Sequence, residues 1–465
     1  MLFSSLTFLF VFLPVVLGVY YILPMKAKNI WLLISSLFFY FYGEPKYLVL
    51  MISVIVSSYV FGLLTDRAEG KARKILLAVS VLISLSALLF FKYTDFFLGT
   101  VNSVFGTDIG LLKLALPIGI SFFTFQAISY NIDVYRKDVP AQKNIINLAL
   151  YVSLFPQLVA GPIVRYSDIN NSLSSRKHTL ESFSYGVRRF VFGFAKKVLL
   201  ANSLGVICET FRDTPEKSTL FFWMYALAFT LQVYFDFSGY SCMAIGLGSM
   251  FGFKFTENFR HPFISTSVTE FWRRWHISLG SWFRDYVYIP MGGNRVSKPR
   301  FFLNILTVWF LTGFWHGADW TFIIWGLYFA ALLLIEKSFP QKIRDKVPSF
   351  VGHIYLAFVV LIGFVIFNAN GVEGAIYDLK GMFTPSYPLV TDTTLYYLRS
   401  YAVLFIVGII GSTPLVKTVV NKFGETKIGA KITAVAEPIV IIGLLTAVTA
   451  YLIDGSYNPF LYFRF

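Results

Sequence analysis

The sequence predicts an all-α, polytopic membrane protein, and three observations indicate it. Of the 465 residues, 56% are hydrophobic and only 14% are charged, whereas an ordinary soluble domain has about 25% charged residues. The mean hydropathy is +0.65. Apolar runs of membrane-spanning length recur from one end of the sequence to the other, and a soluble core could not hide so many of them. We therefore expect a single integral-membrane domain over residues 1–465.

The net charge of +15 does not indicate binding to nucleic acid. The basic residues lie in short loops between apolar runs, where the positive-inside rule places them on the cytoplasmic side. Cys208 and Cys242 are the only cysteines, and they form neither a disulfide framework nor a metal-binding motif.

Four spans are expected in the first hundred residues, at about 3–23, 30–42, 47–64 and 75–91. The first lacks a basic flank and a clear cleavage site, so we expect it to be retained. The loop 65–74 carries four basic residues and is expected in the cytoplasm. Residues 98–112 form a polar segment that contains no Lys or Arg, and we expect this segment outside. This alternation places the N-terminus outside.

Two later segments mix helix breakers and hydroxyl groups into apolar runs, Leu116–Gln126 and Leu154–Pro162. Broken backbone at membrane depth is tolerated only where protein or a water-filled cavity satisfies its polar groups. We therefore interpret one or both as broken or re-entrant helices that line a cavity, and a plain kinked span is the alternative.

The apolar helix expected over residues 185–207 carries Arg188, Arg189, Lys196 and Lys197. We favour snorkelling of these side chains to lipid headgroups over binding of an anionic donor. The next span, about 220–235, leads into Asp236 and Tyr240. A carboxylate in this apolar neighbourhood needs a partner, and the sequence offers Arg273, Arg274 and Arg284.

Further spans are expected at about 320–335, 353–367, 401–410 and 439–453. Lys337, Lys342, Arg344 and Lys346 indicate a cytoplasmic loop, and the segment 368–398 is expected outside together with the C-terminus. In total we expect about eleven membrane helices. Because two outside termini require an even number of full crossings, at least one helix is expected to be re-entrant.

Residues 269–320 combine charges, aromatic rings and two histidines in a chain that is otherwise apolar. Such groups at membrane depth indicate a functional site. His316 lies between Trp315 and Gly317, where a dry setting would favour the neutral imidazole that accepts a proton. Asp319 either orients His316 or caps the next helix, and we favour the cap. The other three histidines, His178, His261 and His353, are expected to be structural.

Several catalytic motifs are absent from the sequence: the G-x-S-x-G elbow, the phosphate-binding loop, H-E-x-x-H and paired cysteines. Direct attack by an acceptor hydroxyl, deprotonated by a histidine, therefore fits better than a stored serine ester.

Residues 269–295, followed by 309–320, closely resemble the membrane-bound O-acyltransferase (MBOAT) family. Within this family the chain is most similar to the bacterial branch that acetylates exported polysaccharides such as alginate. The similarity covers nearly the whole chain and includes residues 3–5, 43–45, 118–126, 155–166, 236–248, 257–259 and 456–460.

The resemblance implies a ring of tilted helices around a thin central funnel, with the catalytic centre at about residues 230–335. It places the essential histidine at His316 and a second characteristic histidine at His276. It also implies that the donor is acetyl-CoA or another acyl thioester, which arrives from the cytoplasm, with no bound cofactor or metal. A hydroxyl of an exported polysaccharide or cell-wall glycan would accept the acetyl group, and an extracytoplasmic acetyltransferase of the serine-hydrolase kind would complete the transfer. The chain is accordingly expected in a bacterial cytoplasmic membrane.

In this interpretation His316 is the general base. The oxyanion would be stabilised by His276, Asn294, Trp315 or a backbone N–H. Arg273, Arg274 and Arg284 either hold donor phosphates or pair with Asp236 and Asp285, and we favour pairing. The residues expected to line the tunnel or bind substrate are Trp315, Asp319, Asn294, Arg274, Arg284, Asp285, Asp236, Tyr240 and Gln126.

Two other functions are considered. A sister branch of the family transfers D-alanine to teichoic acid, but it lacks the turn that this chain has at Ile289–Arg295. A transporter or flippase for polymer or lipid would also use broken helices and a polar centre.

Overall fold

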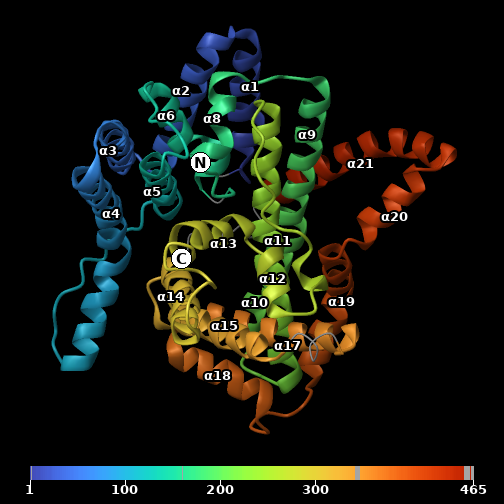
Figure 1. The fold of residues 1–465 in the computed structure, drawn as a ribbon. Helices are drawn as coiled ribbons and strands as arrows, with labels where there is room; N and C mark the ends of the chain where they lie inside the picture. Colours follow the sequence, from blue (N-terminus) through green and yellow to red (C-terminus); the bar gives the residue numbers. More distant parts are fainter. Residues whose placement is uncertain (2, 160, 341–345, 455–460, 462–465) are drawn as a thin grey trace. The chain divides into compact units, whose positions relative to one another are not determined.

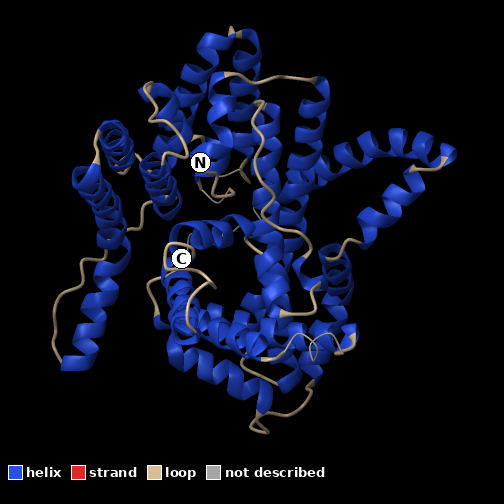
Figure 2. Cartoon of the chain, in the orientation of Figure 1, coloured by secondary structure: helices blue, strands red, loops and turns tan. Residues whose placement is uncertain are grey.

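The computed structural model describes all residues except 2, 160, 341–345, 455–460 and 462–465 (Figure 1). The described residues form helices and connecting loops, with no strand among them (Figure 2). The prediction of an all-α fold is therefore confirmed. Lys342, Arg344 and the segment 456–460 lie outside the described residues.

Eight helices in the described part of the chain are long and apolar enough to cross a membrane. A shorter apolar helix extends over Phe8–Ile22. The eight are α3 (Leu48–Arg67), α4 (Gly70–Phe105), the continuous helix Leu180–Asp213, α11 (Thr219–Met250), α15 (Trp320–Ser338), α17 (Ser349–Asn368), α19 (Asp392–Ser412) and α21 (Lys427–Ile453). From the sequence we expected about eleven membrane helices, and that number also counted broken and re-entrant helices.

The chain divides into two compact units, and each is described by itself. Unit 1 comprises residues 1–190 and 243–256, and unit 2 comprises residues 191–242 and 257–465. The expectation of a single domain stays a prediction.

Unit 1 packs its first helices around a cluster of phenylalanine rings. Phe8 belongs to the π-helix η1 (Phe8–Phe12), which continues into α1 (Leu13–Ile22). Its ring lies 4.8 Å from Phe3, 6.0 Å from Phe39 and 6.2 Å from Phe155, measured between ring centroids. All four residues are buried, so this cluster is the core of the N-terminal helices. The remaining helices of unit 1 are α2 (Met25–Gly43), α3, α4, α5 (Ile120–Arg136), α6 (Ile145–Ser153), α7 (Phe155–Leu158), α8 (Tyr166–Ser174) and the first part of α9 (Leu180–Ala195).

One of the two segments expected to interrupt helices does so. Helix α6 ends at Ser153, and α7 is only four residues long. In the other segment no helix is interrupted, because α5 begins at Ile120, after Gly119 at φ 76°, and continues to Arg136. A Cβ on Gly119 would lie 2.7 Å from the carbonyl oxygen of Leu158, so this left-handed residue also allows a close approach. The break between α6 and α7 is confirmed, and its lining of a cavity stays a prediction.

Several expected boundaries were wrong, and the loop expected at 65–74 is mostly helical, since α3 ends at Arg67 and α4 begins at Gly70. Helix α4 continues to Phe105 and ends at Gly106, which has φ 65°, so the first half of the polar segment 98–112 is helical rather than loop. Helix α2 begins at Met25 instead of residue 30 and has 19 residues. In both cases polar residues at a helix end were taken for a loop, although none of them breaks a helix.

Unit 2 arranges four helices and a π-helical turn in a closed ring of contacts. Helix α12 (Val268–Arg274) contacts α13 (Ile277–Phe283) and α15, while α14 (Lys298–His316) contacts α15 and the turn η4 (Arg284–Tyr288) that follows α13. Figure 1 shows these elements, in yellow and orange, around a common centre. The other elements of unit 2 are the end of α9, η2 (Lys196–Ala201), α10 (Asn202–Asp213), most of α11, η3 (Pro262–Ile264), α17, α18 (Gly371–Phe383), α19, α20 (Leu415–Gly424) and α21.

Candidate active site

His316 is the last residue of α14 and lies among aromatic rings. It is 8% exposed. Its ring centroid lies 5.0 Å from Trp315, 5.1 Å from Trp325 and 5.3 Å from Phe367, in each case edge to face. The predicted dry, aromatic setting of His316 is therefore present in the structure.

Glycines allow α14 and α15 to approach closely enough to enclose His316. A Cβ on Gly313 would lie 2.3 Å from the carbonyl oxygen of Phe322, and one on Gly317 would lie 2.1 Å from the Phe322 ring. On the other helix, a Cβ on Gly326 would lie 2.3 Å from the carbonyl oxygen of Trp309. Small residues at a helix contact permit this kind of close packing within membranes.

His276 connects α12 to α13 and has a left-handed backbone, with φ 45° and ψ 52°. Asn258 fixes the residues that follow it. The carbonyl oxygen of Asn258 accepts a hydrogen bond from the Ile277 N–H at 3.0 Å, and its Oδ1 accepts from the N–H and the hydroxyl of Ser278 at 3.1 and 2.9 Å. The His276 ring packs edge to face on Phe237 at 4.6 Å, and the residue is 2% exposed.

The structure brings the two histidines together, with ring centroids 6.3 Å apart. Burial, and secondly the neighbouring His316, lower the pKa of His276 well below its ordinary value. His276 is therefore neutral at pH 7. Its Nε2 has no hydrogen-bond partner among the described residues, so it is open to a bound group.

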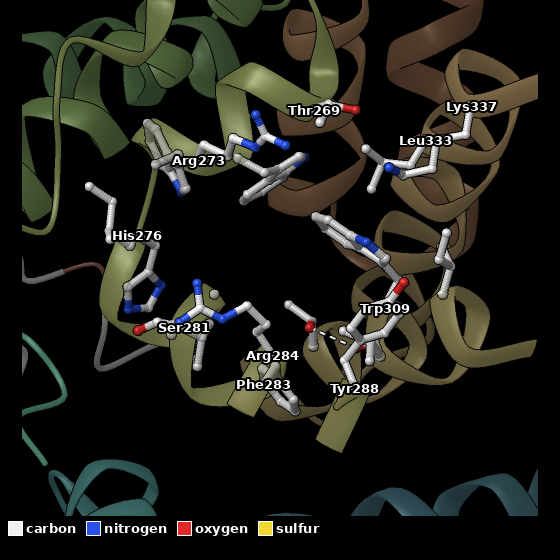
Figure 3. A pocket seen from close by; sticks show the side chains of 18 residues that line it. Thr269, Arg273, His276, Ser281, Phe283, Arg284, Tyr288, Trp309, Leu333 and Lys337 are labelled. Atoms are coloured by element: carbon white, nitrogen blue, oxygen red, sulfur yellow. Dashed lines mark hydrogen bonds between the residues drawn. The ribbon is translucent and has the colours of Figure 1, made fainter. Parts of the chain in front are cut away.

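A cavity of about 490 Å³ lies inside the ring of helices, and His276 is one of its lining residues (Figure 3). Its lining includes several aromatic rings, of which those of Trp272 and Trp309 lie 4.7 Å apart. Arg273, Arg284 and Lys337 add positive charge. In Figure 3, the guanidinium of Arg284 points toward the side of the cavity where His276 lies, and Lys337 lies on the opposite side. The cavity can therefore hold an elongated ligand with an apolar body and an anionic part.

The predicted partners of Asp236 were wrong. Asp236 pairs with Lys197 at 2.7 Å, and both side chains are 2% exposed. The pairing is possible because α11 approaches α9 closely, since a Cβ on Gly239 would lie 2.7 Å from the carbonyl oxygen of Gly193. Lys197 also donates to Asn202 Oδ1 at 2.8 Å. Its expected snorkelling to headgroups was therefore wrong as well.

Of the pairings that we favoured for the arginines of the central stretch, the structure confirms that of Arg284 with Asp285, whereas Arg274 has a partner that we did not predict. Arg274 pairs with Glu270 at 2.8 Å, one helical turn earlier, and Arg284 pairs with Asp285 at 2.6 Å. The pairing with Glu270 was not anticipated, although the i, i+4 spacing could have indicated it.

The other predicted residues are dispersed. Asp319 caps α15 by accepting a hydrogen bond from the Thr321 N–H at 2.8 Å, so the favoured interpretation is confirmed. Asn294 is exposed in the turn before α14 and does not line the cavity. Tyr240 is buried in α11, beyond Asp236, and is likewise absent from the cavity lining. Gln126 is buried in α5 of unit 1.

Two supporting residues were missed. Glu336, near the end of α15, accepts hydrogen bonds from the N–H groups of Val268 and Thr269 at 2.6 and 3.0 Å and thereby fixes the start of α12. Asn304 in α14 donates to the carbonyl oxygen of Gly293 at 2.9 Å and holds the preceding turn. The signal for both was a polar residue within an apolar run.

Comparison with known proteins agrees with this geometry. Residues 137–377 match the family described as MBOAT, membrane-bound O-acyltransferase. The chain is 38% identical to a probable alginate O-acetylase AlgI of Azotobacter vinelandii, over the full length of both chains. It is 36% identical to a peptidoglycan O-acetyltransferase of Helicobacter pylori, over 82% of this chain and 80% of the relative. A teichoic acid D-alanyltransferase of Bacillus subtilis is 29% identical over 54% of this chain and 67% of the relative.

Proposed function

The chain belongs to the membrane-bound O-acyltransferase family, and from that premise we propose that it O-acetylates an exported polysaccharide or cell-wall glycan. It is a multi-pass membrane acyltransferase. The relatives that match along most of its length are named as O-acetylating enzymes of alginate and peptidoglycan. The D-alanyltransferase similarity is weaker and covers about half of the chain. The stronger similarity to O-acetylating enzymes favours acetyl transfer over D-alanyl transfer to teichoic acid and over transport of a polymer or lipid.

The observation that carries the proposal is a pair of buried histidines, one of which lines a cavity. His316 and His276 lie 6.3 Å apart between ring centroids, and His276, but not His316, is a lining residue of the cavity of about 490 Å³. A neutral imidazole can accept and return a proton near pH 7, which is the chemistry that acyl transfer to a hydroxyl requires.

In the proposed reaction the donor is acetyl-CoA or another acyl thioester. His316 takes the proton of the acceptor hydroxyl as the hydroxyl oxygen attacks the acetyl carbonyl carbon. The tetrahedral intermediate then expels the thiolate as the carbon–sulfur bond breaks, and the imidazolium of His316 returns its proton to sulfur. The products are the O-acetyl ester and the free thiol, so atoms and charge balance.

Of the groups considered for stabilising the oxyanion, the rings of Trp315 and His276 lie 5.0 and 6.3 Å from that of His316, and we assign the role to His276. Its ring lies beside His316, and its Nε2 has no partner among the described residues. Asn294 is exposed in a turn and does not line the cavity. A positioned donor of this type contributes about a hundredfold or more in rate.

The cavity is the proposed entrance for the donor. Arg273 and Lys337 line it together with Arg284, and cationic side chains bind phosphate groups strongly. We assign the phosphates of the donor chiefly to Arg273 and Lys337, which line the cavity from α12 and α15.

The proposal includes an orientation and a partner. The positive-inside rule places residues 65–74 in the cytoplasm and both termini outside, in the cytoplasmic membrane of a bacterium. An extracytoplasmic acetyltransferase of the serine-hydrolase kind would receive the acetyl group or place it on the glycan.

The function is tested with His316→Ala in membranes that contain the acceptor glycan and acetyl-CoA labelled in the acetyl group. We expect the rate of glycan labelling to fall by about a hundredfold to ten-thousandfold, because the general base is lost. The variant should remain abundant and folded in the membrane. His353→Ala is the matched control, since His353 is exposed and its ring forms a hydrogen bond with the carbonyl oxygen of Ser265, away from the cavity lining, and it should label normally. Normal labelling by His316→Ala would refute the assignment.

A further inference from the structure

Unit 1 buries two cationic side chains without a carboxylate beside them. Lys28 and Arg176 are each 8% exposed. Arg176 donates to the Tyr20 hydroxyl at 2.8 Å, to Asn29 Oδ1 at 2.7 Å and to the carbonyl oxygen of Ser172 at 3.1 Å, all of which are neutral acceptors. Within the described part of the chain, neither cation forms an ion pair with an acidic residue. The buried Lys197 of unit 2, in contrast, has Asp236.

The two cations share one aromatic ring. Lys28 Nζ lies 4.5 Å from the centroid of the Tyr20 ring, and the guanidinium carbon of Arg176 lies 5.7 Å from it. The ring hydroxyl also contacts His178 Nε2 at 2.8 Å. Burial, and secondly Arg176, lower the pKa of Lys28, while burial, Lys28 and Arg176 lower the pKa of His178. The local potential is therefore positive, and nothing in this cluster neutralises it.

A pocket of about 390 Å³ adjoins this cluster, and Arg176 is one of its lining residues. The other polar side chains that line it are Lys26, Asn29, Asn144, Asn147 and Ser174, and none of the described lining residues is acidic. One guanidinium nitrogen of Arg176, Nη2, has no hydrogen-bond partner among the described residues. The nine-residue helix α6 begins at the pocket, where Asn144 is its N-cap, and a helix N-terminus carries partial positive charge.

Buried charges are costly unless an opposite charge compensates them. Arginine and backbone or amide N–H groups together match the oxygens of a phosphate group, which arginine can bind through two parallel hydrogen bonds. The pocket has room for such a group and for part of the molecule that carries it. An anion in the pocket would compensate the charge of Arg176 and reduce the repulsion between the two cations.

We propose that this pocket of unit 1 binds a phosphate group, carried either by an anionic lipid headgroup or by a soluble ligand. Arg176 supplies positive charge at the pocket and Lys28 adds charge beside it, across the shared Tyr20 ring, and the amides of Asn144 and Asn147 supply neutral hydrogen-bond donors. This binding site goes beyond acyl transfer and does not depend on the roles of His316 and His276.

The test uses the full chain, purified in a phosphate-free neutral detergent, with thermal unfolding as the readout. In one arm inorganic phosphate is titrated against chloride at equal ionic strength. In the other, bilayer discs of phosphatidylcholine alone are compared with discs of equal parts phosphatidylcholine and phosphatidylglycerol. The variants are Arg176→Gln and Lys28→Met. Lys177→Gln is the matched control, because it removes an exposed charge next to Arg176.

We expect an increase in Tm for the wild type and for Lys177→Gln in at least one arm. The half-saturating phosphate concentration should rise about tenfold or more in both site variants, since each loses a charged contact. If Arg176→Gln fails to fold, Lys28→Met remains decisive: without ligand it should melt no lower than the wild type, because repulsion is relieved. Stabilisation only by phosphatidylglycerol identifies a headgroup site, and stabilisation by inorganic phosphate identifies a soluble ligand. No stabilisation in either arm, or an unchanged response of Lys28→Met, would overturn the proposal.

Discussion

At the scale of single residues, His276 keeps a backbone conformation that costs energy. A non-glycine residue in the left-handed region is uncommon, and such strain costs about 1–3 kcal/mol unless the surroundings hold it. Asn258 provides that support through the two residues after His276. The sequence predicted His276 as a site residue, but not its conformation, because Asn258 and Phe237 meet it only in the folded chain.

The neutral state of His276 makes stability depend on pH. Burial and His316 lower its pKa well below the ordinary value of 6.5. Because the unfolded chain then binds the proton more readily, the contribution of His276 is complete above about pH 6.5 and is lost as the pH falls below that value. We expect the wild type to lose thermal stability on acidification, and His276→Asn to lose less, since Asn tolerates the left-handed region. Thermal unfolding across this pH range measures the difference. Parallel pH curves for the two proteins would contradict the expectation.

At the scale of elements, the contact of α14 with α15 places His316 among its aromatic neighbours. Local signals predicted some elements well: glycines and prolines marked the start of α5 and the break around α7, and Asp319 was correctly predicted as a cap. Contacts between distant elements were not predictable in the same way. Asp236 faces Lys197 rather than the arginines of the central stretch, because the crossing of α9 and α11 depends on glycine packing that spacing alone does not show.

The close contact at Gly313 should tolerate no additional methyl group. A Cβ there would lie 2.3 Å from the carbonyl oxygen of Phe322, so Gly313→Ala should separate the helices, displace His316 and cost about 1–3 kcal/mol. Both thermal stability and acetyl transfer should fall. Gly443→Ala in α21 is the matched control, since no atom lies within 4 Å of its added Cβ, and it should be neutral or slightly stabilising. If Gly313→Ala and Gly443→Ala were equally stable, the contact between α14 and α15 would accommodate the added methyl group, and the prediction would be wrong.

At the scale of the whole molecule, composition was sufficient to predict the fold class but not to predict where each helix begins and ends. The low charge content predicted a helical membrane protein, and eight described helices meet the length and apolarity that a span requires. Helix α4 nevertheless extends into residues that polarity assigned to a loop, since Asn and Ser are tolerated near a helix end. The catalytic centre was predicted through resemblance of long motifs, whereas the cavity and its aromatic walls depend on how four separate helices meet.

The orientation of the chain follows from its charges and can be tested directly. Basic residues are concentrated at 65–74, where α3 ends and α4 begins, while residues 98–112 and 384–391 have none, and segments between spans that are rich in Lys and Arg stay in the cytoplasm. We expect Asp108→Cys and Ser386→Cys, both at exposed positions, to react in intact spheroplasts with a maleimide that does not cross membranes. Lys71→Cys should react only after the membrane is opened. The native Cys208 and Cys242 are buried and should stay unlabelled in the wild type. Labelling of Lys71→Cys in intact spheroplasts would show that the topology is the inverse of the one expected. The proposed donor entrance would then lie on the wrong side of the membrane for a cytoplasmic thioester.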